Sequence, residues 1–215
     1  MLVIKYTKIG RAKFISHLDF LRHFSRTLRR ASVVLEMSKG YVPHELMYFA
    51  PPSTTGLTSY AEYCCIATSE KVDGFLEKFN VSAIEGVTAL WVREIDKNPN
   101  LASKAVFAEY ELPYEIELSN KIKSAFDGDK FEITFEKKGE MTTKEVRRLM
   151  HSYEIENDKI KIVLAVGENT LRIDRFLNAI GFASLVGVEK TKLFAFDVDG
   201  KSLIDIDDYI VDKNN

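Results

Sequence analysis

The sequence predicts an α+β protein made of two tandem ferredoxin-like (βαββαβ) domains with antiparallel sheets. Each half of the chain has the pattern strand, helix, strand, strand, helix, strand. The polar stretch 96–103, which contains a proline, separates the halves and is typical of a linker. We therefore place an N-terminal basic domain at 1–96 and a C-terminal domain at 104–215. The alternative is one merged α+β sheet built from the same elements.

The first half begins with alternating apolar residues over 2–7, which indicate a strand with one buried face. Ser16 followed by Asp19 is a helix-start signal and predicts a helix over about 17–31. The remaining expected elements are strands at 33–37, 46–50, 59–68 and 87–95 and a short helix at 70–79. Together these elements complete the first βαββαβ unit.

The second half repeats this architecture without obvious sequence identity to the first. Its expected elements are extended segments at 105–118, 131–138, 144–156, 159–166 and within 181–197, and helices at 120–126 and 170–180. A sheet with helices on one face leaves the other face open, and RNA-recognition modules use such an open face. Analogy of fold therefore favours RNA binding, but it sets only a starting expectation for the function.

Composition excludes several classes of protein. The longest apolar runs are far shorter than the roughly 20 residues of a membrane span. The N-terminus lacks the pattern of a signal peptide, so we expect a cytoplasmic protein without membrane contact. The two cysteines, Cys64 and Cys65, are adjacent and on a strand point to opposite faces, so no disulfide is expected. No cysteine spacing suits a metal or an iron–sulfur cluster, and no cofactor is expected.

Charge is distributed unevenly along the chain. Residues 1–50 contain nine Lys and Arg and three Asp and Glu, which gives a charge of +6. Because the net charge of the chain is −2, the remaining residues carry −8. A basic N-terminal face suits a polyanion such as RNA, although chance also produces such asymmetry in a small protein.

The helix in FISHLDFLRHFSRTLRRA concentrates this charge. The expected buried stripe is Phe20, Leu21, Phe24, Leu28 and Ala31, and the opposite side carries Arg22, Arg26, Arg29 and Arg30. An ordinary solvated face is one interpretation. The other is polyanion contact, because only Asp19 balances the arginines on this helix.

Three further features are candidate site residues. His17 lies in the first turn of the helix, where a phosphate-facing or acid–base role competes with packing under the strand. The loop GYVPHE contains His44 and Tyr41, and Lys39 comes just before it. Lys39 offers a cation and Tyr41 a ring that can stack on a base. The loop FAPPSTTG is rich in hydroxyls and can cradle a phosphate or be a plain rigid loop, since it lacks the ending of a Walker loop.

These segments resemble one family across nearly the whole chain. FISHLDFLRHFSRTLRRA, GYVPHELMYFAPPSTTG, SYAEY, TKEVRRLM and VGENTLRIDRFLNAIG are similar to the radical SAM-linked protein family of bacteria, also called DUF2344. The resemblance implies a companion of a radical SAM enzyme in RNA modification or metabolism. The chain departs from the family's pattern at Val42, Leu46 and Arg147, which puts in doubt any role attached to those positions.

We accordingly expect an accessory RNA-binding protein that works with a radical SAM enzyme and has no catalytic activity of its own. Phosphate contacts are assigned to Lys13, Arg22, Arg26, Arg29 and Lys39, and a nearby pocket to His17, Tyr41 and His44. One alternative is a metal-independent RNA endonuclease-like enzyme that uses His17 and His44. The other is a pure protein-docking module for the radical SAM enzyme.

Overall fold

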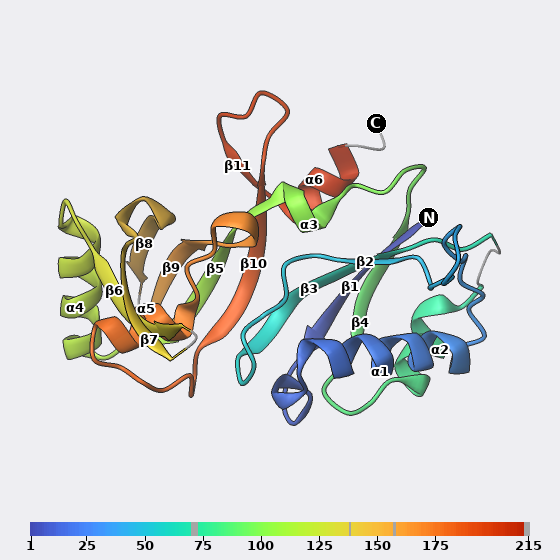
Figure 1. Ribbon diagram of the computed structural model, residues 1–215, viewed down its shortest axis with the longest axis horizontal. Helices are drawn as coiled ribbons and strands as arrows, with labels where there is room; N and C mark the ends of the chain where they lie inside the picture. Colours follow the sequence, from blue (N-terminus) through green and yellow to red (C-terminus); the bar gives the residue numbers. More distant parts are fainter. Residues whose placement is uncertain (70–72, 138, 157, 213–215) are drawn as a thin grey trace.

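Strands from both halves of the chain join in one mostly antiparallel sheet (Figure 1). The computed structural model describes residues 1–69, 73–137, 139–156 and 158–212, and within them the sheet has nine strands. In spatial order the main strands are β4 (Ala89–Glu94), β1 (Leu2–Lys8), β3 (Thr58–Ile66), β10 (Glu189–Phe196), β5 (Ala105–Pro113), β9 (Lys159–Ala165) and β8 (Met150–Glu156). Two short strands complete it, β2 (Met47–Phe49) on β3 and β11 (Leu203–Asp205) on β10.

Helices pack on the strands of both halves. The helices are α1 (His17–Arg30), α2 (Phe75–Ser82), α3 (Leu101–Lys104), α4 (Ile116–Asp127), α5 (Ile173–Ala179) and α6 (Ile206–Asp212). One core cluster fills the space between the first two helices and the N-terminal strands. A larger cluster runs from the other face of those strands across the sheet to the residues of α4 and α5. The molecule is therefore a mixed α+β protein, as the sequence predicts at this level.

The two halves meet where β10 pairs with β3, and this junction is short. Only two residue pairs form it, Glu189 with Thr58 and Lys190 with Ser59, and here the strands run parallel. Farther along β3, the edge that pairs with β10 pairs instead with β2. Farther along β10, the edge that pairs with β3 pairs instead with β11. The sheet is thus continuous, as in the merged-sheet alternative, but the two halves diverge immediately beside the junction.

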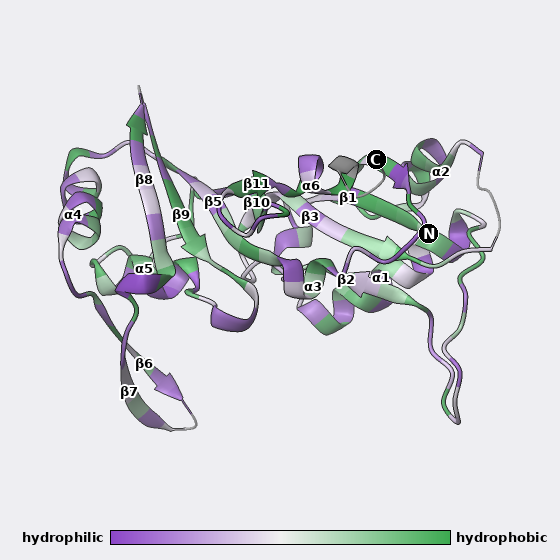
Figure 2. Cartoon of the chain, turned by 90° about the horizontal axis from the view of Figure 1, so that it is seen from above, coloured by the Kyte–Doolittle hydropathy of each residue, from purple (hydrophilic) through white to green (hydrophobic). Residues whose placement is uncertain are grey.

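Two segments project from the same side of the molecule (Figure 2). One is the hairpin of β6 (Glu132–Lys137) and β7 (Glu140–Glu145), a separate two-stranded sheet. The other lies between α1 and β2. Its two sides are joined by isolated contacts, such as the Met37–Glu45 bridge and the hydrogen bond that the Ser38 N–H donates to the His44 carbonyl at 2.8 Å. We call residues 36–46 the arm.

The start of α1 follows the sequence prediction closely. Ser16 caps the helix, and its Oγ accepts a hydrogen bond from the Asp19 N–H at 3.3 Å. Phe20, Phe24, Leu28 and Ala31 are buried and Leu21 is half-buried, so the apolar stripe is confirmed except at Leu21. The predicted strand over 33–37 is wrong, because α1 ends in a turn with a positive φ of 59° at Ser32 and the chain then enters the arm.

Other boundaries differ for local reasons. The helix predicted at 70–79 begins at Phe75, after Gly74 in the left-handed conformation, and residues 70–72 lie outside the described part of the chain. The extended segment predicted over 105–118 ends at Pro113, and α4 begins at Ile116. The segment 144–156 is interrupted by a 3-10 turn at 147–149 (η2).

The expected open face of the N-terminal strands is covered. The Asp207 carboxylate in α6 accepts hydrogen bonds from Lys5 Nζ at 2.7 Å and from the Tyr63 hydroxyl at 2.8 Å. Ile206 and Ile210 belong to the same buried cluster as Tyr63. A C-terminal helix has therefore taken the position that an RNA-recognition module leaves free for bases.

The structure also bears on the expectations about the cysteines, membrane spans and metal sites. Cys64 and Cys65 are buried in different core clusters, so they point to opposite faces of β3 as predicted. Among the described residues, no helix combines the length and apolar character needed to cross a bilayer. Within the same residues, no group of three or more His, Cys, Asp or Glu gathers at a place that would hold a metal ion.

Candidate functional site at the sheet junction

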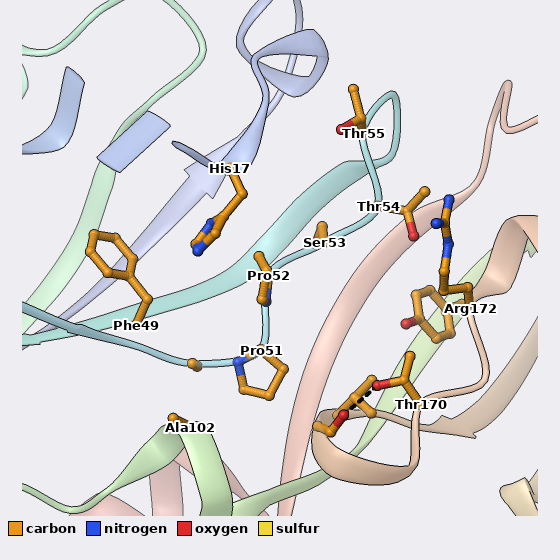
Figure 3. Close-up of a pocket in the computed structure, with 14 residues that line it drawn as sticks. His17, Phe49, Pro51, Pro52, Ser53, Thr54, Thr55, Ala102, Thr170 and Arg172 are labelled. Atoms are coloured by element: carbon orange, nitrogen blue, oxygen red, sulfur yellow. Dashed lines mark hydrogen bonds between the residues drawn. The ribbon is translucent and has the colours of Figure 1, made fainter. Parts of the chain in front are cut away.

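A cavity of about 530 Å³ opens where the two halves diverge (Figure 3). The loop after β2 crosses this gap, because β2 and β10 occupy successive parts of one edge of β3. The lining residues from the first half are His17 and the run Phe49–Thr55. Those from the second half are Ala102, Tyr110, Val166, Gly167, Thr170 and Arg172. The hydroxyl-rich loop FAPPSTTG therefore forms one wall of the cavity.

A buried ion pair lies under this loop. Lys190 Nζ is 2.6 Å from Glu62 Oε1, and the two side chains are 2% and 5% exposed. The Ser59 hydroxyl donates to the same carboxylate oxygen at 2.6 Å, and the Ser53 hydroxyl donates to it as well. A β-bulge in the pairing of β1 with β3 allows Ser59 and Glu62 to face the same region.

The environment of Glu62 favours its ionised form. Burial opposes ionisation, yet the Lys190 ammonium and the donated hydrogen bonds outweigh it, so the pKa of Glu62 lies below its ordinary value. The Glu62 carboxylate is therefore ionised at neutral pH. Ser53 connects it to the cavity, because this residue both bonds to Glu62 and lines the wall.

A second buried lysine adjoins the pair. Lys8 is 5% exposed, and its ammonium donates to the Ile15 carbonyl at 2.8 Å and lies 5.0 Å from the centroid of the Phe20 ring. Burial lowers the pKa of Lys8, against the attraction of the Glu62 carboxylate. Both Lys8 and Lys190 pair with Ser59 in the sheet, so two lysines and Glu62 lie close together behind Ser53, and none of the three is among the residues that line the cavity.

His17 stands at the first residue of α1, beside these charges. Its ring is edge-on to the Phe49 ring, with centroids 6.1 Å apart, and it lines the cavity. Partial burial and the nearby Lys8 ammonium lower the pKa of His17 from its ordinary value. The imidazole is therefore mainly neutral at pH 7, and an anion beside it would favour the charged form.

The opposite wall depends on a glycine. Gly167 has a φ of +76°, and a Cβ at this position would lie 2.9 Å from the Ala105 carbonyl oxygen. The Thr170 hydroxyl donates to the Gly167 carbonyl at 2.6 Å and closes the turn. Arg172 follows, with its guanidinium bonded to the Asp174 carboxylate at 2.6 and 3.0 Å.

Several predicted phosphate contacts on α1 are engaged with acidic groups. Arg22 pairs with Asp19 at 3.1 Å, and Arg29 donates to Glu45 at 2.6 and 2.8 Å. Arg26 is exposed and has no hydrogen-bonded or ionic partner among the described residues. The basic face of α1 is thus less free than its composition indicates.

The other predicted residues divide between two places. Lys13 lies near the cavity, where its Nζ donates to the Thr58 hydroxyl at 3.3 Å. Lys39, Tyr41 and His44 are on the arm, and Tyr41 is fully exposed.

The structure does not bring the two histidines into one site. The neighbour of His44, Glu45, is bonded to Arg29 near the end of α1, whereas His17 begins the helix. Twelve residues of α-helix span about 18 Å. His44 instead bonds through Nδ1 to the Ser38 hydroxyl at 2.8 Å, and it does not line the cavity.

The segment KEVRRLMH (144–151) contains an arginine with a structural role. The Arg147 guanidinium donates to the carbonyls of Phe126, Gly128 and Met150 at 2.6, 2.9 and 3.0 Å. The first two carbonyls lie at the end of α4, so Arg147 caps that helix.

Sequence reasoning missed the buried ion pair behind the cavity wall. A lone glutamate in the otherwise apolar strand SYAEYCCIA is a usable signal, because a charge at a buried position needs a partner. No local pattern distinguishes Lys190 from Lys192, or Arg172 from Arg175, as a residue of this site.

Comparison with known proteins gives a family but no relative of known activity. Residues 1–174 match the family described as "Uncharacterized protein conserved in bacteria (DUF2344)". This match covers most of the chain, which therefore belongs to that family. A search of curated proteins finds no match. Lys190 and α6 lie beyond the matched residues.

Proposed function

We propose that this member of the DUF2344 family is an RNA-binding protein that works beside a radical SAM enzyme in RNA modification or metabolism. The observation that carries the RNA part is the junction cavity, whose lining brings together His17, hydroxyls from both halves and the Arg172 guanidinium. The radical SAM part comes from the family resemblance of FISHLD and the segments that follow it.

The charge of the cavity supports a polyanionic ligand. Lys8, Lys190 and Glu62 lie buried behind its Ser53 wall, and Arg172 and His17, the first residue of α1, are among its lining residues. A helix N-terminus presents unpaired N–H groups and a partial positive charge, both of which attract phosphate. Arg26 adds an exposed cation on the same helix, without an ionic partner among the described residues.

The strand order supports two ferredoxin-like halves. The N-terminal strands run in the order β4-β1-β3-β2 and the C-terminal strands in the order β10-β5-β9-β8, with antiparallel neighbours in both. The first half follows the chain order βαββαβ, and the second half follows it from β5 to β10 with the separate β6–β7 hairpin inserted after α4. On this proposal RNA binds at the junction of the halves, and the covered sheet face plays no part.

Equilibrium binding of a short single-stranded RNA tests the RNA part. We expect affinity to fall by orders of magnitude between about 50 and 200 mM salt if several phosphates are contacted. Arg26→Gln should weaken binding, and the matched control Lys123→Gln, an exposed cation on α4, should not. Affinity that does not change with salt, or no affinity at all, would contradict the proposal.

A protein-docking role is the second candidate, and the arm favours it. Tyr41 is fully exposed and Val42 is 84% exposed at the end of this projection. Co-purification with a radical SAM enzyme from the native cells, compared between the wild type and Tyr41→Ser, tests this role. A complex that is lost in Tyr41→Ser, with RNA affinity unchanged, would assign the arm to docking and the cavity to RNA.

A further inference from the structure

The C-terminal strands have a solvent-facing side, opposite the helices α4 and α5. Ala108 of β5 and Leu193 of β10 are fully buried in the core cluster that includes residues of those helices. The adjacent pair in register is Glu109 with Lys192, of which the first is half-buried and the second exposed. Successive residues of a strand point to opposite faces, so these charged side chains mark a face in contact with solvent. In the N-terminal half, α6 covers the open face instead.

Two phenylalanines lie at one end of this face, where they line a second cavity of about 500 Å³. Phe107 of β5 and Phe196 of β10 are an even number of residues from Glu109 and Lys192, and Phe196 is 43% exposed. The planes of the two rings are nearly perpendicular, at 89°, and their centroids are 6.4 Å apart. A planar group that stacks on Phe196 would therefore meet the Phe107 ring edge-on, which is a favourable aromatic geometry.

The polar side chains of this second cavity have no partners in the described part of the chain. Arg148 is exposed, and it forms no hydrogen bond or ion pair with any described residue. The same holds for the side chains of Glu168 and Asn169, in the 3-10 turn η3 (Gly167–Asn169). Arg148 and Glu168 are the only charged residues among the described lining residues, and their charges cancel. The lining therefore favours a neutral planar group with polar edges over an ion.

A nucleobase has this combination of properties. Its faces stack on aromatic rings, and its edges carry donors and acceptors that pair with arginine, asparagine and glutamate side chains. The volume of the second cavity lies within the usual range of small-molecule sites. The second cavity also adjoins the junction cavity, because Val166 lines both, and of the next two residues Gly167 lines the first and Glu168 the second. A strand bound at the junction therefore has a base-sized recess beside it.

We propose that the second cavity holds one unpaired base of the RNA, stacked on Phe196 and bonded at its edge by Arg148 and Asn169. This inference rests on the proposed RNA-binding function and names its substrate class. Every base has a face that can stack, whereas contacts to the edge distinguish one base from another. A base inside a duplex is already stacked and paired, so the site selects single-stranded RNA with a base preference at one position.

The first test uses the wild-type full chain and needs no protein variant. Affinities are measured for a short single-stranded RNA, for the same RNA with one base removed at each position in turn, and for a duplex of the same sequence. Removing the base at one position should lower the affinity about five- to a hundredfold, which is the loss of one stacked base. The duplex should bind more weakly than the single strand.

Variants then connect that position to the second cavity. Phe196→Ala should weaken binding of the intact RNA, and removing the base should then cost little more, because the ring beneath it is absent. The matched control Tyr114→Ala removes a ring that is also 43% exposed but does not line the cavity, and it should behave as the wild type. Arg148→Met, at an exposed position, should reduce the preference among the four bases. Thermal unfolding should show that all three variants remain folded.

The outcomes separate this inference from the function beneath it. Salt-dependent RNA binding that no abasic position weakens overturns the base site and leaves RNA binding in place. A base effect that persists in both Phe196→Ala and Arg148→Met places the base elsewhere and also overturns the inference.

The absence of any RNA affinity overturns the proposed function. Binding of guanosine monophosphate that is lost in Phe196→Ala would then still support the base site, and no such binding would overturn it as well. A radical SAM enzyme that co-purifies with the wild type and not with Phe196→Ala, while both bind RNA equally, would assign the cavity to a protein partner and overturn the inference.

Discussion

Replacing Glu62 with leucine should destabilise the protein more than any other single loss of a carboxylate that forms an ion pair. The side chain is 5% exposed at an ion-pair distance of 2.6 Å from Lys190, which is itself 2% exposed. The substitution leaves this ammonium buried without a counterion, and it removes the acceptor of the Ser53 and Ser59 hydroxyls.

The expected loss follows from that geometry. Removing one partner of a buried ion pair costs about 3–5 kcal/mol of unfolding free energy. For a chain of this size, each kcal/mol shifts the melting temperature by about 2–4 °C. The melting temperature should therefore fall by about 6–20 °C, measured by circular dichroism at pH 7 and checked by urea denaturation.

Two controls isolate the buried pair. Glu117→Leu removes a carboxylate from the exposed pair with Lys121 and should cost under about 1 kcal/mol. The double variant Glu62→Leu/Lys190→Met removes both charges and should recover much of the stability that Glu62→Leu loses. A loss for Glu62→Leu no larger than that for Glu117→Leu, or no recovery in the double variant, would refute the reasoning.

Three further predictions concern pH, a glycine and a helix cap. Because the pKa of Glu62 is lowered on folding, its contribution to stability should be complete above the ordinary glutamate pKa and lost as pH falls through the folded value. Urea titrations from pH 7 to 3 should show a steeper decline for the wild type than for Glu62→Gln, and parallel curves would contradict this. Gly167→Ala should cost about 1–3 kcal/mol more than an unstrained substitution, and more than Gly200→Ala, where the φ is also positive but no atom lies within 4 Å of the added Cβ. Arg147→Met should cost about 2–3 kcal/mol, because three carbonyls lose a charged donor; equal melting temperatures for Arg147→Met and Arg148→Met would refute the capping role.

The helix α1 shows how much local sequence predicts. Its cap at Ser16 and its buried stripe through Phe20, Phe24 and Leu28 follow from residues three or four positions apart. The same local reasoning fails directly after the helix. Residues 33–37 have the composition of a strand, yet they lack a neighbouring strand and lead into the arm.

The candidate site was only partly visible in the sequence. His17 and the loop FAPPSTTG are local features, a first helical turn and a cluster of hydroxyls, and both line the cavity. The pairing of His17 with His44 fails to form because α1 separates them. The face expected to be open is closed by α6, which comes from the opposite end of the chain.

The sequence by itself therefore determined the α+β class, the order of most elements, the capped basic helix and the family. Only the tertiary structure decided that β3 and β10 join the halves, and that Glu62 and Lys190 meet beneath a cavity. The reason is the range of the interactions. A helix is specified by neighbours within one turn, whereas a strand partner or a buried counterion comes from any part of the chain. The junction pairs residues more than half the chain apart, and no local pattern records which lysine that partner is.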